Sequence, residues 1–229
     1  MASTYIDLCN QTLRRLNEVE ISEAEFLTVI GVQALVKDAV KSAVARINQS
    51  EFEWPFNAAS HTQTLTAGTN EYSWPTSFKA VDWNSFQIQE SASLGASYKV
   101  LKFLERDEWY KLHRDADFTT GSDGRGIPDF VFPSHGSGFG VTQSPNAAYS
   151  LVFKYYLNYT DITASSDTTR IPKTFDSILV SGALYHMYLF KDNVESAQAA
   201  FLTFQEGLKN LQTIYINNYA SVTDTRLNF

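Results

Sequence analysis

Residues 194–215 read VESAQAAFLTFQEGLKNLQTIY, with apolar side chains in steps of three and four over three heptads. This spacing predicts a helix that packs lengthwise against neighbouring helices. The stripe fits either the core of one helical bundle or a face shared with another subunit in a ring. The residues of this seam are Val194, Ala197, Phe201, Phe204, Leu208, Leu211 and Tyr215.

Three more helices are expected around this one. Ser3 or Thr4 can cap a helix over residues 5–16, with Asp7 in its first turn and Asn17 at its end. The other two are expected at residues 32–50, before Pro55, and at residues 174–190, after Pro172.

The middle of the chain has the composition of β-strands separated by turns. A short helix over residues 105–114 interrupts it. The expected fold class is therefore α+β: N- and C-terminal helices form a bundle (1–56 and 173–216), an antiparallel β domain is inserted (57–172), and a C-terminal arm follows (217–229). The expected strands are 62–66, 81–88, 100–103, 130–132, 138–142 and 149–159.

The bulk composition describes a globular chain. Of 229 residues, 44 % are hydrophobic, 19 % are charged and 14 % are aromatic, a share that suits both cores and interfaces. The net charge is −7 and no segment collects Lys or Arg, so a basic surface for gripping nucleic acid is not expected. The N-terminus has no signal-peptide pattern and no apolar run is long enough to cross a bilayer, which predicts a soluble protein made in a reducing cytoplasm, without a membrane partner.

The sequence departs from the known patterns of catalytic and metal-binding sites at specific positions. Cys9 is the one cysteine, and its spacing with Leu8 and Leu13 suggests a buried apolar residue. The four histidines (His61, His113, His135 and His186) form no metal-binding pattern. We therefore expect no catalytic residue, no cofactor and no metal.

Two loops resemble ligand sites only in part. The stretch from Asp115 to Asp117 begins like a calcium loop, but Thr120 and Gly126 stand where glycine and glutamate are required. The glycines of residues 136–140 have no following helix and no Gly-Lys-Ser/Thr, so they indicate a β-turn region rather than a phosphate loop.

Two further segments lie outside these patterns. Trp54-Pro55-Phe56-Asn57 follows the second helix and fits a hydrophobic plug, with a sugar or peptide site as the alternative. The last dozen residues are polar except at their end, Leu227-Asn228-Phe229. They fit either a disordered tail or an arm that becomes ordered on a partner.

In order and spacing, these parts resemble the head-to-tail adaptor (tail tubular protein A) family of short-tailed phages over nearly the whole chain. The segments that carry the resemblance are Ile6–Glu18, Trp54–Asn57, Leu65–Pro75, Gly126–Phe130, Tyr149–Tyr156, Ile171-Pro172 and Phe175–Leu184.

The resemblance implies a structural virion protein of the phage neck. Such a protein forms a homo-oligomeric ring, typically of twelve copies, between the portal protein and the tail nozzle protein. DNA passes through the lumen during ejection without specific binding. Leu227, Asn228 and Phe229 are then expected to contact the portal. The alternatives are a tail protein that binds a receptor or glycan through its aromatic β domain, and a cell-wall hydrolase.

Overall fold

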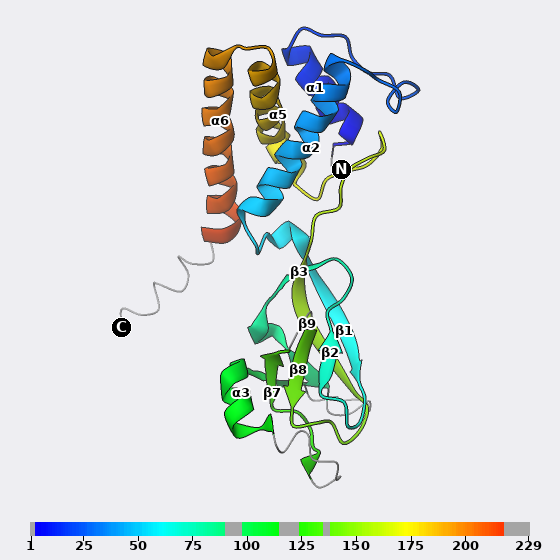
Figure 1. Cartoon of the computed structure of the whole chain (residues 1–229), viewed down its shortest axis with the longest axis vertical. Helices are drawn as coiled ribbons and strands as arrows, with labels where there is room; N and C mark the ends of the chain where they lie inside the picture. Colours follow the sequence, from blue (N-terminus) through cyan, green and yellow to red (C-terminus); the bar gives the residue numbers. More distant parts are fainter. Residues whose placement is uncertain (1–2, 90–97, 115–123, 135–137, 218–229) are drawn as a thin grey trace, which may run out of the picture. The chain divides into compact units, whose positions relative to one another are not determined.

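The computed structural model describes residues 3–89, 98–114, 124–134 and 138–217 (Figure 1). The chain forms an α+β fold of two compact units. Residues up to Asn57 and from Tyr159 onward form a helical unit, and residues Ala58–Asn158 form a unit of strands inserted between them.

Helix α1 (Tyr5–Arg15) begins at a capping box, as the sequence indicates. The Asp7 N–H donates to Thr4 Oγ1 over 3.3 Å, and the Thr4 N–H donates to Asp7 Oδ2 over 3.1 Å. These two bonds satisfy donors that a helix N-terminus leaves free. The helix ends at Leu16, after which Asn17 takes a left-handed conformation with φ of 56°.

Helix α2 (Val32–Ser50) is followed by a short 3-10 turn, η1 (Pro55–Asn57). Trp54 is fully buried, and its indole Nε1 donates to the carbonyl of Ile47 over 2.7 Å. Asn57 Nδ2 donates to Asn48 Oδ1 over 2.8 Å. The segment from Trp54 to Asn57 therefore packs back onto the last turns of α2.

Helix α5 (Asp176–Phe190) is the centre of the helical unit. It is apolar on nearly all sides and buried, because α1, α2 and α6 (Val194–Gln212) all pack against it (Figure 1). A 3-10 turn, η4 (Lys173–Phe175), leads into α5, and a π-helical turn, η5 (Thr213–Asn217), extends α6. The large buried side chains of this core include Tyr5, Phe26, Trp54 and Phe204.

The segment over residues 159–172 packs with the helices, although its composition placed it in the inserted domain. Ile162 and Ile171 are buried in the helical core. The N–H of Tyr5 donates to the carbonyl of Asp167 over 2.7 Å, and the N–H of Ile6 donates to Ser165 over 3.2 Å. Donors at the start of α1 thus fix this loop in place.

The strand unit contains two hydrogen-bonded sheets. In the five-stranded sheet β9 (Tyr149–Leu157) is central and pairs with β1 (Ala58–Leu65), β3 (Phe78–Val81) and β4 (Gln87–Gln89), while β5 (Tyr98–Val100) pairs with β4. The other sheet has the order β2 (Glu71–Ser73), β8 (Gly138–Thr142), β7 (Phe130–Pro133) and β6 (Lys102–Phe103). A short helix, α3 (Arg106–Leu112), packs on β7.

Two strand predictions need correction. Residues 81–88 are not one strand, because Asp82 accepts a bond from the Asn84 N–H and starts a 3-10 turn over Trp83–Ser85. The predicted strand at 100–103 is likewise divided between β5 and β6. The pairing of β6 with β7 is parallel, whereas we expected an antiparallel domain throughout.

Candidate assembly surfaces of the helical unit

The described residues hold no group of three or more His, Cys, Asp or Glu side chains that could bind a metal ion. His61 lies on β1 against the ring of Phe153, and His186 lies on α5 beside Tyr185. Gly138 and Gly140 are buried in β8, which is a strand and not a phosphate loop. The calcium-like residues Asp115–Thr120 and His135 lie outside the described residues.

In the helical unit, burial shifts the pKa values of Cys9 and His186 toward the neutral form of each side chain. Burial raises the pKa of the Cys9 thiol to about 12, against a smaller opposing effect of Lys37. Burial lowers the pKa of His186, and the neighbouring charge of Arg46 lowers it further. Both shifts disfavour the charged forms, a reactive thiolate at Cys9 and a protonated imidazole at His186.

A polar cavity of about 240 Å³ lies within the helical unit. Asn57 lines it, and the Asn57 side-chain oxygen has no protein partner although the residue is almost fully buried. No Cys, His, Asp or Glu lines this cavity, and its polar groups are Asn, Thr, Tyr and Arg side chains. Its lining residues are Val44, Asn48, Asn57, Tyr159, Thr160, Ile162, Thr168, Thr169 and Arg170.

The seam of α6 divides between the core and the surface. Phe204 and Leu211 are buried, and Val194 is 68 % exposed. The half-buried members are Phe201, whose ring lies 5.5 Å from the Arg46 guanidinium, Leu208, and Tyr215, whose ring meets those of Phe56 and Phe175 edge-on. The other predicted contact residues, Leu227, Asn228 and Phe229, lie outside the described residues.

The loop between α1 and α2 presents a surface that the sequence did not single out. Leu27 is 80 % exposed and Ile30 is 84 % exposed, in a segment that also carries four glutamates and no basic residue. The loop is nevertheless anchored: Phe26 is buried against the Tyr5 ring, and Lys37 Nζ donates to the Phe26 carbonyl over 2.6 Å. The exposed aliphatic side chains therefore stand on a fixed base.

A groove between the start of α5 and the end of α6 forms a second surface, with a volume of about 390 Å³. Its apolar walls come from Phe175, Ile178 and Ile214. Gly207 forms the floor on α6, where a Cβ atom would lie 2.6 Å from the Ile178 side chain. The groove is also lined by Thr174, Ser177, Asn210 and Thr213.

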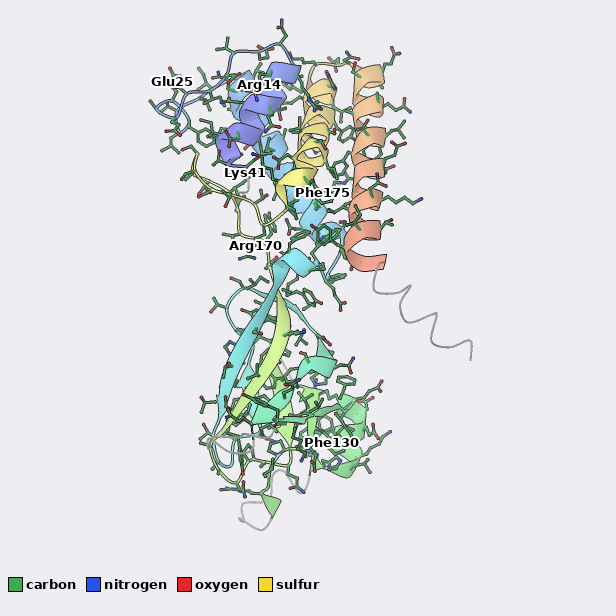
Figure 2. The ribbon with its side chains drawn as sticks, turned by 180° about the vertical axis from the view of Figure 1, so that it is seen from behind. Arg14, Glu25, Lys41, Phe130, Arg170 and Phe175 are labelled. Atoms are coloured by element: carbon green, nitrogen blue, oxygen red, sulfur yellow. The ribbon has the colours of Figure 1, made fainter. Side chains whose placement is uncertain are left out.

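The loop and α6 lie on opposite sides of the helical unit. Figures 1 and 2 view the unit from front and back, and in both α5 stands between α6 and the loop that carries Glu25. In Figure 2 Phe175 lies at the start of α5, on the side of the unit away from that loop. Among the described residues, no helix is long and apolar enough to span a membrane.

Within the described residues, the helical unit presents two apolar contact surfaces, the loop between α1 and α2 and the α5–α6 groove. The family model of the SU10 adaptor protein matches residues 3–226, nearly the whole chain. The chain therefore belongs to the SU10 adaptor protein family, a family of structural phage adaptors and not a class of enzymes. A search among curated proteins found no matching relative.

Proposed function

We propose that this phage adaptor is a head-to-tail adaptor of the tail tubular protein A type. In this role, about twelve copies form a ring between the portal and the tail nozzle, with DNA passing through the lumen. Family membership supports the adaptor role, and the surfaces of the helical unit support the ring.

The observation that carries the proposal is the pair of apolar surfaces on opposite sides of the helical unit. A ring of identical subunits needs two different faces on each subunit, one for each neighbour. The loop that bears Leu27 and Ile30 supplies one candidate face, and the α5–α6 groove supplies another.

The charge of the chain suits a channel through which DNA moves. A net charge of −7 repels the phosphate backbone, so the strand is enclosed without being held. Residues 217–229 are the proposed portal-contacting arm, with Leu227, Asn228 and Phe229 as its contact residues. Burial of the Phe229 side chain on the portal would contribute about 2 kcal/mol.

Native mass spectrometry of the chain with and without the portal protein of the same phage tests the proposal. We expect a monomer or weak oligomer alone, and a ring on the portal. Absence of any complex at micromolar concentration would contradict the adaptor role.

A deletion of residues 217–229 tests the arm separately. We expect portal binding to be lost while the helical circular dichroism signal stays unchanged. The matched control replaces the same residues by an equal length of Gly and Ser, and it should behave like the deletion. Unchanged assembly in both variants would refute the arm assignment but would not contradict the proposed ring.

A second role is favoured by aromatic side chains on the strand unit. Tyr98 is 55 % exposed and Phe103 is 41 % exposed. Exposed aromatic side chains can mark a surface that binds a receptor or a glycan. Binding of the full chain to a glycan array, lost when both residues are replaced by Ser, would support this alternative.

A further inference from the structure

Three aromatic rings meet at η5, the turn that extends α6. The Tyr215 ring lies 6.1 Å from the Phe56 ring, with an angle of 87° between the planes, and 5.8 Å from the Phe175 ring, at 65°. Both are edge-to-face contacts, an arrangement that aromatic pairs prefer. We call Phe56, Phe175 and Tyr215 the aromatic clamp. Its members come from η1, η4 and η5, so the clamp joins three segments that are far apart in the sequence.

The Trp54–Asn57 segment fixes the clamp to the helical core. The Phe56 ring stacks on the Trp54 ring, with the centroids 5.1 Å apart and the planes at 17°. Trp54 is fully buried, and its indole N–H donates to the carbonyl of Ile47 in α2. The clamp residues themselves are half-buried, at the edge of this core. The segment that the sequence suggested as a hydrophobic plug therefore supports a ring contact on η5.

The backbone that carries Tyr215 is unusual. In η5 (Thr213–Asn217) the hydrogen bonds run from i to i+5, as in a π-helix, instead of from i to i+4 as in α6. Such turns are rare and occur frequently at functional sites. Tyr215 lies two residues before residue 217, where the proposed portal-contacting arm begins. The clamp therefore holds the chain directly before this arm.

We propose that the aromatic clamp holds the root of the C-terminal arm and sets the direction in which the arm leaves the helical unit. The inference rests on the proposed function, in which residues 217–229 contact the portal, and it makes Tyr215 a positioning residue for that contact. An arm with a fixed root loses less conformational freedom on binding than an arm with a loose root, so the clamp strengthens portal binding. Because the clamp consists of ring contacts, it needs the ring of Tyr215 and not its hydroxyl group.

Portal binding by full-length variants tests the clamp. Tyr215→Ala should bind the portal protein of the same phage about tenfold more weakly than the wild type, because the arm must then be ordered from its root. Tyr215→Phe keeps the ring and should bind as the wild type does. The matched control is Phe190→Ala, which removes a ring that is 59 % exposed at the other end of α5 and should not change binding. Surface plasmon resonance measures the affinities.

An insertion separates positioning of the arm from packing of the core. Gly-Ser-Gly-Ser placed directly after Asn217 keeps every clamp residue but uncouples the arm from the clamp. We expect the insertion to weaken portal binding about as much as Tyr215→Ala does, and the chain with both changes to bind no more weakly than either alone. Damage to packing alone would instead add to the effect of the insertion.

Several results would overturn the inference. Additive losses in the chain with both changes would do so, and so would a loss in Tyr215→Phe or Phe190→Ala as large as in Tyr215→Ala. If Tyr215→Ala does not fold, the insertion decides alone, and an insertion chain that binds like the wild type contradicts the clamp.

The deletion of residues 217–229 shows which proposal has failed. If the deletion abolishes portal binding while Tyr215→Ala binds as the wild type does, the clamp is wrong and the proposed arm stands. If the deletion leaves portal binding unchanged, the arm assignment itself is wrong, and the inference that rests on it is wrong as well.

Discussion

Gly182 occupies the point where α5 meets both α2 and α6. A Cβ atom at this position would lie 2.9 Å from the Ala43 Cβ and 2.9 Å from the Phe204 ring. The first of these atoms belongs to a side chain that cannot rotate away. The close approach of three helices at the centre of the unit therefore depends on the absence of a side chain here.

We expect Gly182→Ala to lower the free energy of unfolding by about 1–2 kcal/mol. Overpacking costs about 1–3 kcal/mol, and alanine recovers up to about 1 kcal/mol through its helix propensity. Urea denaturation followed by the helical circular dichroism signal measures the difference. Thr203→Ala, at an exposed position of α6, is the control and should change little; a Gly182→Ala variant of unchanged stability would contradict this packing.

Asp176, at the start of α5, gives the helical unit a dependence on pH. Its carboxylate accepts a bond from the Ser3 hydroxyl, and burial raises its pKa above the ordinary 3.8 despite that bond. The folded chain therefore holds this proton more tightly than the unfolded chain does. Asp176 consequently lowers stability progressively as pH rises from the unfolded value through the raised folded pKa.

Asp176→Asn should remove this decline, because a neutral amide can still accept the Ser3 bond and has no proton to lose. Thermal melts from acidic to neutral pH measure it. We expect a flatter profile for Asp176→Asn, and a steeper one for Ser3→Ala, which removes a bond that favours the ionised form. Identical profiles for the wild-type chain and both variants would exclude Asp176 as the cause.

The cap of helix α1 contributes to the stability of more than this helix. The first turn that the cap stabilises also binds the loop over residues 159–172. Thr4→Ala removes the acceptor of the Asp7 N–H and should cost about 1 kcal/mol. The side-chain bond of Thr4 is the largest of the effects that lower the Asp7 pKa, so the Asp7 pKa should rise in this variant. The stabilisation from Asp7, present above the unfolded pKa and lost as pH falls through the folded pKa, is then lost at higher pH.

NMR titration of the Asp7 carboxyl measures that change, with Thr4→Ser as the control that keeps the cap. A Thr4→Ala chain whose Asp7 titrates as in the wild type would show that the backbone bond alone sets this pKa.

The helices could be predicted from the sequence because their signals are local. The range expected for α2, residues 32–50, matches Val32–Ser50, since an apolar stripe and a following Pro define it. The loop over residues 17–31 gave no such signal. Tyr5 and Lys37, which lie elsewhere in the sequence, pack against Phe26, while Leu27 and Ile30 remain exposed.

The α5–α6 groove could not be predicted either, because it is formed by residues that are distant in sequence. Its walls come from segments about thirty residues apart, Thr174–Ile178 and Gly207–Ile214, and neither has an unusual composition. The stripe of α6 was recognised, but periodicity alone does not say which apolar side chains remain exposed once α5 is in place. Phe204 and Leu211 entered the core, while Ile214, outside the stripe, is half exposed.

At the scale of the whole molecule, the two units have separate cores, and the chain passes between the units twice. The helical core and the aromatic core of the strand unit, which contains Phe86, Phe139 and Phe153, share no buried residue. Strands β1 and β9, the first and the last of the strand unit, pair with each other, and Ala58 lies opposite Tyr156. The chain therefore enters and leaves the strand unit at neighbouring points. An insertion with this geometry is expected to fold independently of its host.

We therefore expect replacement of residues 58–158 by a short Gly-Ser linker to leave the helical unit folded. Calorimetry should retain one cooperative transition, and hydrogen exchange should still protect the amides of α5. Because the loop that bears Leu27 and Ile30 and the α5–α6 groove both belong to the helical unit, the shortened chain should still form a ring on the portal. Loss of α5 protection would mean that the helices need the strand unit to fold, whereas a folded chain that forms no ring would mean that the strand unit is needed for assembly.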